Sequence, residues 1–261
     1  MTLKEYFDHS VVQEKNLLNK CSNDIPHLSM VLRSKNIAFA LYSFFEEHNL
    51  QKAKQYFYVC GLLDAFRIKN YQDRMFDYNI ASIGYAMLSD NLLFVKEVYA
   101  NLTYNTFYLE DKTKREIPLS MDEMVEDGEG TIFVHTVQQF LKGNNELTER
   151  NLSIMENKYL PKKKQRQELA RCEVDFFKAL FQKDKAGCEK SLQEMVSPKI
   201  HNRTNYHEIL LKKYISMPAL CYAKLAWICG VEVEIKSKLI PKELLPVQPN
   251  ERYEIPYDFL P

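Results

Sequence analysis

The chain has 261 residues, with 35 basic and 35 acidic side chains and therefore a formal net charge of zero. This balance argues against a protein whose whole surface coats nucleic acid, because such proteins carry a basic excess. Aromatic residues make up 12% and hydrophobic residues 46%, which excludes a chain that is mainly disordered. Glycine is scarce, at 7 residues, and β-rich folds need many tight turns, so long helices are favoured.

The sequence shows no sign of secretion or membrane insertion. The first residues have no basic stretch followed by an apolar core, as a secretory signal would. No apolar run reaches the roughly 18 residues of a membrane span, and the longest, Ile215 to Val231, is broken by a serine, a proline and a lysine. The six cysteines form no Cys-x-x-Cys pair and mostly lie in apolar stretches, as free core thiols do. We therefore expect a cytoplasmic protein.

Apolar residues recur at helical spacing along most of the chain. Seven such stripes lie within residues 28–45, 53–63, 80–87, 92–102, 133–141, 169–180 and 188–195. Short polar joints separate them at residues 46–49, 89–91, 142–145 and 182–184, and each contains an asparagine or aspartate that can cap the next helix. The joints are about 40 to 55 residues apart, near the period of drifted helix-turn-helix repeats. An irregular antiparallel bundle needs similar turns and stays open as the alternative.

Two regions depart from the helical pattern. Residues 104–130 are polar and mixed, which is typical of a long surface connection or a pair of short elements. Later, Ile209 to Ile228 predicts the most buried helix, kinked or restarted at Pro218. Beyond it, Val231 to Ile235 alternates apolar and polar residues as a short exposed strand does, and five prolines after residue 240 predict an extended tail.

These patterns predict an all-α fold: a helical-repeat-like (TPR-like) stack of antiparallel helices, a minor short strand and an extended proline-rich C-terminal tail. Residues 1–261 form a single domain in this prediction, in which 1–103 and 131–261 are two halves that share one core. The residues expected to be largely buried are Phe176, Phe177, Leu180, Leu220, Leu225 and Trp227.

No pattern of catalytic or metal-binding residues is recognisable. The sequence has no glycine-rich phosphate loop, no Gly-x-Ser-x-Gly and no His-Glu-x-x-His. His201 and His207 are six residues apart with nothing nearby to complete a ligand set, so a polar loop leading into a helix is the simpler interpretation. His135 is interpreted as a hydrogen-bonded residue on a helix surface, and Cys172 as a core residue. We expect no enzyme activity, no cofactor and no metal.

Two runs of charge are more informative. An acidic cluster without an intervening base consists of Asp122, Glu123, Glu126, Asp127 and Glu129. A basic cluster follows Pro161 and consists of Lys162, Lys163, Lys164 and Arg166, in the expected first turn of a helix. Either run can be a solvated face. The acidic cluster is the better candidate interface, because carboxylates on a rigid scaffold can occupy a basic cleft and steer association with it.

Several segments of the C-terminal half form a recognisable series: Ala170–Leu180, Lys183-Asp184, Leu192, Leu225–Val233 and Ile240–Pro246. Over roughly Glu168 to Pro246, this series resembles the immunity protein 49 family. The resemblance implies a helical-repeat fold and a protein that neutralises a cognate toxin from a polymorphic toxin or type VI secretion system. It supplies no catalytic or interface residues. From the residues alone, a helical-repeat scaffold or regulator that binds a peptide in a concave groove stays open, as does an enzyme with a cryptic site.

Overall fold

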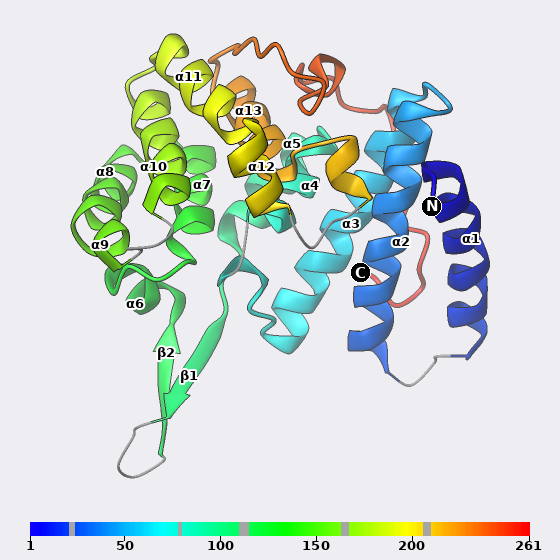
Figure 1. Cartoon of the computed structure of the whole chain (residues 1–261). Helices are drawn as coiled ribbons and strands as arrows, with labels where there is room; N and C mark the ends of the chain where they lie inside the picture. Colours follow the sequence, from blue (N-terminus) through cyan, green and yellow to red (C-terminus); the bar gives the residue numbers. More distant parts are fainter. Residues whose placement is uncertain (21–23, 78–79, 110–114, 163–166, 206–209) are drawn as a thin grey trace.

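Pairs of consecutive helices joined by tight polar turns are the unit of the fold (Figure 1). The computed structural model describes residues 1–20, 24–77, 80–109, 115–162, 167–205 and 210–261. The four pairs are α2 (Ile25–Phe45) with α3 (Leu50–Tyr71), α4 (Ala81–Leu88) with α5 (Leu92–Glu97), α7 (Ile132–Lys142) with α8 (Asn145–Ile154), and α10 (Gln167–Phe181) with α11 (Lys185–Met195). The helices of each pair pack against each other, which confirms the predicted helical stack.

The four turns share one local structure. Each contains a residue in the left-handed region, with φ between 51° and 68°: His48, Asp90, Gly143 and Lys183. Each next residue caps the following helix by accepting a backbone N–H at 2.9 to 3.1 Å: Asn49, Asn91, Asn144 and Asp184. The capping predicted for the polar joints is therefore confirmed. Because the side-chain oxygen satisfies an otherwise unpaired N–H, these residues fix where the second helix of each pair begins.

The remaining elements connect and flank these pairs. The longer ones are α1 (Leu3–Lys20), α6 (Met121–Glu126), α12 (Pro198–Thr204) and α13 (Met217–Ile228). A π-helical turn, η3 (Met155–Tyr159), continues α8 into α9 (Leu160–Lys162). The single-turn elements are η1 (Met75–Asp77), η2 (Tyr99–Asn101), η4 (Leu211–Lys213) and η5 (Lys242–Leu244). Within the described part of the chain, no helix is both long and apolar enough to cross a membrane.

The strands lie elsewhere than expected. An antiparallel hairpin forms from β1 (Asn105–Leu109) and β2 (Glu116–Ser120), inside the region predicted to be either a long surface connection or a pair of short elements. Residues 231–235 are extended and alternate in burial as predicted, but the strand prediction there is wrong. The reason is that no neighbouring strand pairs with them: the N–H of Val233 bonds the carbonyl of Val231, and that of Glu234 bonds the Glu189 side chain.

The predicted core is largely confirmed. Five of the six named residues are buried: Phe176, Phe177, Leu180, Leu220 and Leu225. Trp227 is only half-buried, because it lies at the end of α13, where its indole N–H donates to the carbonyl of Val233 at 3.1 Å. Pro218 lies in the first turn of α13, so the most apolar segment restarts there as a new helix; Ile209 lies outside the described residues. Buried residues from both halves belong to one hydrophobic cluster, and the division into a single domain stays a prediction.

The C-terminal tail returns from α13 to the N-terminal helices (Figure 1). Tyr253 donates to the carbonyl of Ser89 at 2.5 Å, and Asn36 on α2 donates to the Tyr257 hydroxyl at 2.7 Å. Asn250 donates to the carbonyl of Gln51 on α3 at 2.8 Å. The extended tail that the prolines predict therefore ties the last helix to the first helix pair.

The close approach of α4 and α13 at a glycine leads to a first testable prediction. A Cβ added to Gly84 on α4 would lie 1.8 Å from the sulfur of Cys221 on α13, closer than any non-bonded contact allows. We expect Gly84→Ala to lower the free energy of unfolding by about 2 kcal/mol, because overpacking a core forces side chains and backbone to shift.

A double-mutant cycle in chemical denaturation checks this expectation. Cys221→Ala removes the clashing sulfur, so the Gly84→Ala/Cys221→Ala protein should be more stable than the sum of the two single changes predicts. Additive effects would show that α4 and α13 do not approach this closely.

Candidate functional site

The acidic cluster lies on α6 and the turn after it. The helix begins with a capping box: Ser120 accepts the N–H of Glu123 at 3.3 Å, and the Glu123 carboxylate accepts the N–H of Ser120 at 2.7 Å. The Ser120 hydroxyl also donates to Glu123, and these bonds from the hydroxyl and the N–H lower the pKa of this carboxyl. Glu123 therefore stays ionised and fixes the start of α6.

The turn after α6 presents the remaining carboxylates. Gly128 has a φ of 69°, a conformation that glycine adopts without strain, and the N–H of Glu129 bonds the carbonyl of Met124 at 3.0 Å. A Cβ on Gly128 would lie 2.9 Å from the Lys158 side chain, so the turn packs tightly against η3. The acidic cluster therefore lies close to the helix that precedes the basic run, although the two segments are far apart in the sequence.

Three basic side chains from the α8–α9 helix line the acidic cluster. Arg150 forms ion pairs of 3.0 Å with both Asp122 and Glu126, and Lys162 forms one of 3.0 Å with Glu129. Lys158 donates to the carbonyl of Glu126 at 2.5 Å. Of the predicted basic cluster, Lys162 contacts the acidic one, whereas Lys163, Lys164 and Arg166 lie outside the described residues.

These ion pairs leave the carboxylates available at the surface. The side chains of Asp122, Glu126 and Glu129 are 65%, 49% and 55% exposed, and those of Glu123 and Asp127 are exposed as well. An exposed ion pair stabilises the protein by at most about 1 kcal/mol. Basic side chains of a partner can therefore replace Arg150 and Lys162 as the counter-ions of these carboxylates. All five predicted residues therefore share one accessible surface.

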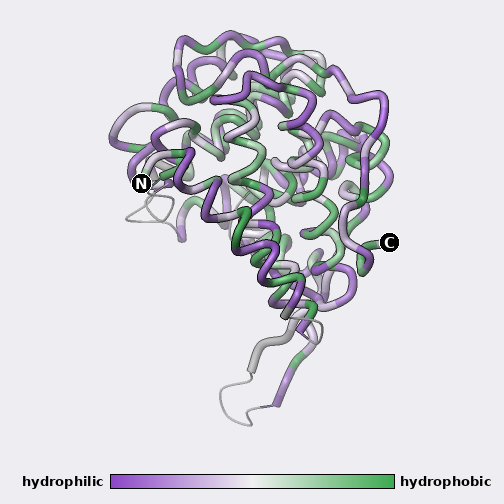
Figure 2. Tube along the Cα trace, turned by 90° about the vertical axis from the view of Figure 1, so that its right-hand side faces the viewer, coloured by the Kyte–Doolittle hydropathy of each residue, from purple (hydrophilic) through white to green (hydrophobic). Residues whose placement is uncertain are grey.

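The β1–β2 hairpin projects from the helical body next to this surface, as both whole-molecule views show (Figure 1 and Figure 2). Its strands pair from Asn105 opposite Ser120 to Leu109 opposite Glu116, and β2 runs directly into α6. A two-stranded hairpin is marginally stable by itself in water, and both of its edges can accept a further strand. The hairpin and the acidic cluster together form a projecting surface that suits a concave partner.

Sequence reasoning located this region but missed its strands. The segment Asn-Thr-Phe-Tyr-Leu is rich in aromatic and β-branched residues, which is the signal that could have revealed the first strand, whereas Glu-Ile-Pro-Leu-Ser contains only one such residue, Ile117. Pro118 weakens that signal, although a proline is tolerated on an edge strand because its missing N–H costs no ladder bond there.

The histidines named from the sequence lie in separate places. His135 is half-buried rather than on the surface, with Asn151 and Gln139 within 2.8 and 3.1 Å of its ring nitrogens. Burial, and then the charge of Arg150, lower its pKa to about 4, so it is neutral near pH 7. His201 is buried inside α12 and 2.9 Å from the carbonyl of Lys212, so it does not belong to a polar loop; His207 lies outside the described residues.

The titratable groups of α10 are part of the core. Cys172 is buried as predicted, and burial, followed by the hydrogen bond to Glu194, raises its pKa to about 12. Burial also raises the pKa of Glu173 to about 7, against the opposing effect of the Tyr222 hydroxyl, which donates to it at 2.9 Å. This bond joins α10 to α13. Within the described residues, no three histidine, cysteine, aspartate or glutamate side chains converge as metal ligands would.

The fold and the site define a mainly helical protein of stacked helix pairs with one projecting hairpin beside a charged surface. Residues 131–244 match the family model of immunity protein 49. The match runs from the start of α7 to η5, so the resemblance predicted from the C-terminal segments is confirmed; the hairpin, α6 and the N-terminal helices precede it. Neither a comparison with curated proteins nor one with solved structures found a match.

Proposed function

We propose that this protein is a non-enzymatic, cytoplasmic immunity protein that binds a cognate antibacterial toxin and neutralises it by occluding its active site. The observation that carries the proposal is the match of residues 131–244 to immunity protein 49. The toxin would come from a polymorphic toxin or type VI secretion system. The proposed partner is a protein, and the proposal involves neither nucleic acid nor a membrane.

We propose further that the acidic cluster and the adjoining hairpin are the toxin-binding surface. Toxins that attack nucleic acids or nucleotides have basic clefts, and a complementary acidic surface increases both the association rate and the specificity of an inhibitor. Because the net charge of the chain is zero, such a surface has to be local. Asp122, Glu126 and Asp127 supply it next to a hairpin that projects from the helical body.

A charge reversal tests this surface. Glu126→Lys/Asp127→Lys should weaken binding of the toxin domain encoded beside this gene by about 100-fold or more, because like charges would then face each other. Glu123 is left in place because its carboxylate caps α6. Calorimetric titration measures the affinity, and inhibition that competes with the toxin's substrate would indicate occlusion of the active site.

The matched control changes net charge equally at exposed positions outside the acidic cluster. Glu97→Lys/Glu251→Lys alters two glutamates that form no ion pair within the described residues, so its affinity should equal that of the wild type. Equal affinity of both variants would exclude the acidic cluster as the contact surface. Absence of any binding by the wild type would contradict the immunity function and favour the alternative, a helical-repeat scaffold for another protein or peptide.

A further inference from the structure

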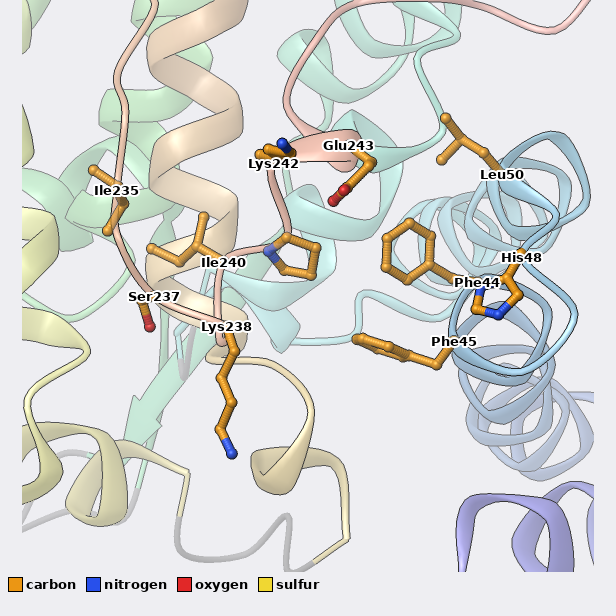
Figure 3. A pocket seen from close by; sticks show the side chains of 11 residues that line it. Phe44, Phe45, His48, Leu50, Ile235, Ser237, Lys238, Ile240, Lys242 and Glu243 are labelled. Atoms are coloured by element: carbon orange, nitrogen blue, oxygen red, sulfur yellow. The ribbon is translucent and has the colours of Figure 1, made fainter.

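A hollow and a helix face lie outside the acidic cluster. The hollow, of about 570 Å³, lies between the α2–α3 turn and residues 235–243 (Figure 3). Lys238, Lys242 and Glu243 all line it, so its charge selects no particular kind of ligand. The helix face is the outer side of α1, where the order of apolar and charged residues does select a partner.

The inner face of α1 packs against α2 and fixes how the helix is turned. The ring of Phe7 lies 4.0 Å from that of Tyr42 and 5.5 Å from that of Phe39, measured between centroids. Leu3 and Ser10, on the same side of the helix, are buried. Because an α-helix has 3.6 residues per turn, the residues on the opposite side of α1 face solvent.

The outer face of α1 is a stripe of exposed side chains three or four residues apart, which therefore lie one above the other. It consists of Lys4, Asp8, Val11, Lys15 and Leu18, with Val12 beside Val11. Val11, Val12 and Leu18 are 43%, 60% and 47% exposed. They are three of the nine large hydrophobic residues exposed in the described part of the chain. Such a concentration of apolar surface on one helix face is typical of a protein contact.

The charges of this stripe are arranged symmetrically about the two valines. Asp8 lies three residues before Val11, and Lys15 lies three residues after Val12. When two copies of α1 lie antiparallel about a two-fold axis that passes between the valines, each Asp8 faces Lys15 of the second copy. Each valine then meets its own counterpart at the centre. The stripe is therefore complementary to itself in charge as well as in hydrophobicity.

The same order of charges disfavours a parallel arrangement. A parallel pair would place Asp8 against Asp8 and Lys15 against Lys15, and these like charges repel. Lys15 forms no ion pair within the described residues. The side chain of Asp8 is 57% exposed, although Lys4 approaches it at 3.2 Å. Both charged groups are thus accessible to a second copy.

We infer that the outer face of α1 binds the same face of a second copy of this chain in an antiparallel contact. Val11 and Val12 of both copies form its centre, two Asp8–Lys15 pairs flank them, and the aliphatic stem of Lys4 covers Leu18 of the other copy. Since α1 is about 27 Å long, the contact buries less than the roughly 800 Å² per partner of a standard interface, and the dimer is weak and reversible. In Figure 1, α1 and the helices beside the acidic cluster lie at opposite edges of the molecule, so the dimer uses a surface separate from the proposed toxin-binding one.

Sedimentation equilibrium of the full chain over a series of concentrations tests the inference. The wild type should show a monomer–dimer equilibrium with a Kd of roughly 100 µM. Val11→Ser/Val12→Ser should weaken it by about tenfold or more, because it removes the apolar centre of the contact. Both valines are exposed, so circular dichroism should show an unchanged fold. A wild type that stays monomeric at concentrations on the order of 1 mM would overturn the inference, as would a dimer that this variant leaves intact.

A charge exchange tests the antiparallel order. Asp8→Lys should weaken the dimer by about tenfold, because it places like charges against each other at both ends of the contact. Adding Lys15→Asp to this variant restores opposite charges in reversed order and should return the affinity to near that of the wild type. Glu97→Lys makes the same change of net charge as Asp8→Lys at an exposed position on α5 and should associate as the wild type does. Failure of the second substitution to restore the dimer, or equal effects of Asp8→Lys and Glu97→Lys, would contradict the inference.

Discussion

Replacing Asp90 by asparagine is expected to lower the free energy of unfolding by about 3–5 kcal/mol, among the largest effects of any single change in this protein. Asp90 is fully buried and lies between two buried lysines, pairing with Lys54 at 2.8 Å and with Lys224. Removing its charge would leave both ammonium groups inside the protein without a counter-ion, and that penalty exceeds what is lost when an exposed ion pair is broken.

The same group of residues fastens the C-terminal tail. Lys224 donates to the carbonyls of Leu244, Leu245 and Pro246, each at 3.0 Å, and Lys54 donates to that of Gln248 at 2.7 Å. Asp90 also has a φ of 62°, a conformation that asparagine tolerates well. The substitution therefore tests the charge and not the backbone of the turn.

The effect should depend on pH in a defined direction. Burial lowers the pKa of Lys224 to about 8, although the adjacent Asp90 raises it, and loss of Asp90 would lower it further. In the unfolded Asp90→Asn protein, Lys224 has an ordinary pKa near 10.5, whereas in the folded protein its pKa lies below 8. Between these two values the unfolded state binds more protons than the folded state, so the stability of the variant rises with pH across that interval. We expect the deficit of Asp90→Asn to be larger at pH 7 than at pH 9, where Lys224 can be neutral.

Urea denaturation at the two pH values measures the deficit, and Asp258→Asn is the matched control. Asp258 is exposed and forms no ion pair within the described residues, so its replacement should change stability by no more than about 0.5 kcal/mol. A deficit of that size for Asp90→Asn, or one that grows with pH, would show that the buried lysines do not rely on this carboxylate.

The parts of the fold that follow from local chemistry are those that the sequence predicts. The capping residues Asn49, Asn91, Asn144 and Asp184 act on N–H groups three residues away, so their role can be seen in a short stretch of sequence. The same holds for Pro218, which excludes a continuous helix at its position. Helix pairs and their approximate boundaries are therefore predictable.

Features that join distant segments are not predictable in this way. Arg150 and Lys162 come close to the acidic cluster only in the folded chain. In the sequence the cluster therefore looks like an uncompensated negative charge, whereas in the structure these two side chains partly balance it. Asp90 looks like an ordinary turn residue, but it is the buried counter-ion of a lysine 134 positions later. Residues 231–235 have the alternation of a strand without a strand to pair with, because pairing depends on a neighbour and not on the pattern itself.

Truncating Phe177 to alanine is expected to cost about 3–4 kcal/mol of stability. Its ring is fully buried on α10, where it contacts Phe133 and Phe140 from α7 at centroid distances of 6.1 and 5.9 Å and Tyr222 from α13 at 5.3 Å. Three helices of the family-matched region thus meet at this one side chain, and a cavity there would be lined by large rings that cannot close over it.

The comparison that isolates this effect uses the same helix and the same substitution. Phe181 lies one turn further along α10 and is only half-buried, so Phe181→Ala should cost clearly less than Phe177→Ala. Phe177→Leu, which leaves a smaller cavity, should fall between Phe177→Ala and the wild type. The denaturation midpoints of the three variants, measured with circular dichroism, should follow that order. An unchanged midpoint for Phe177→Ala would mean that α7, α10 and α13 do not share a core at this residue.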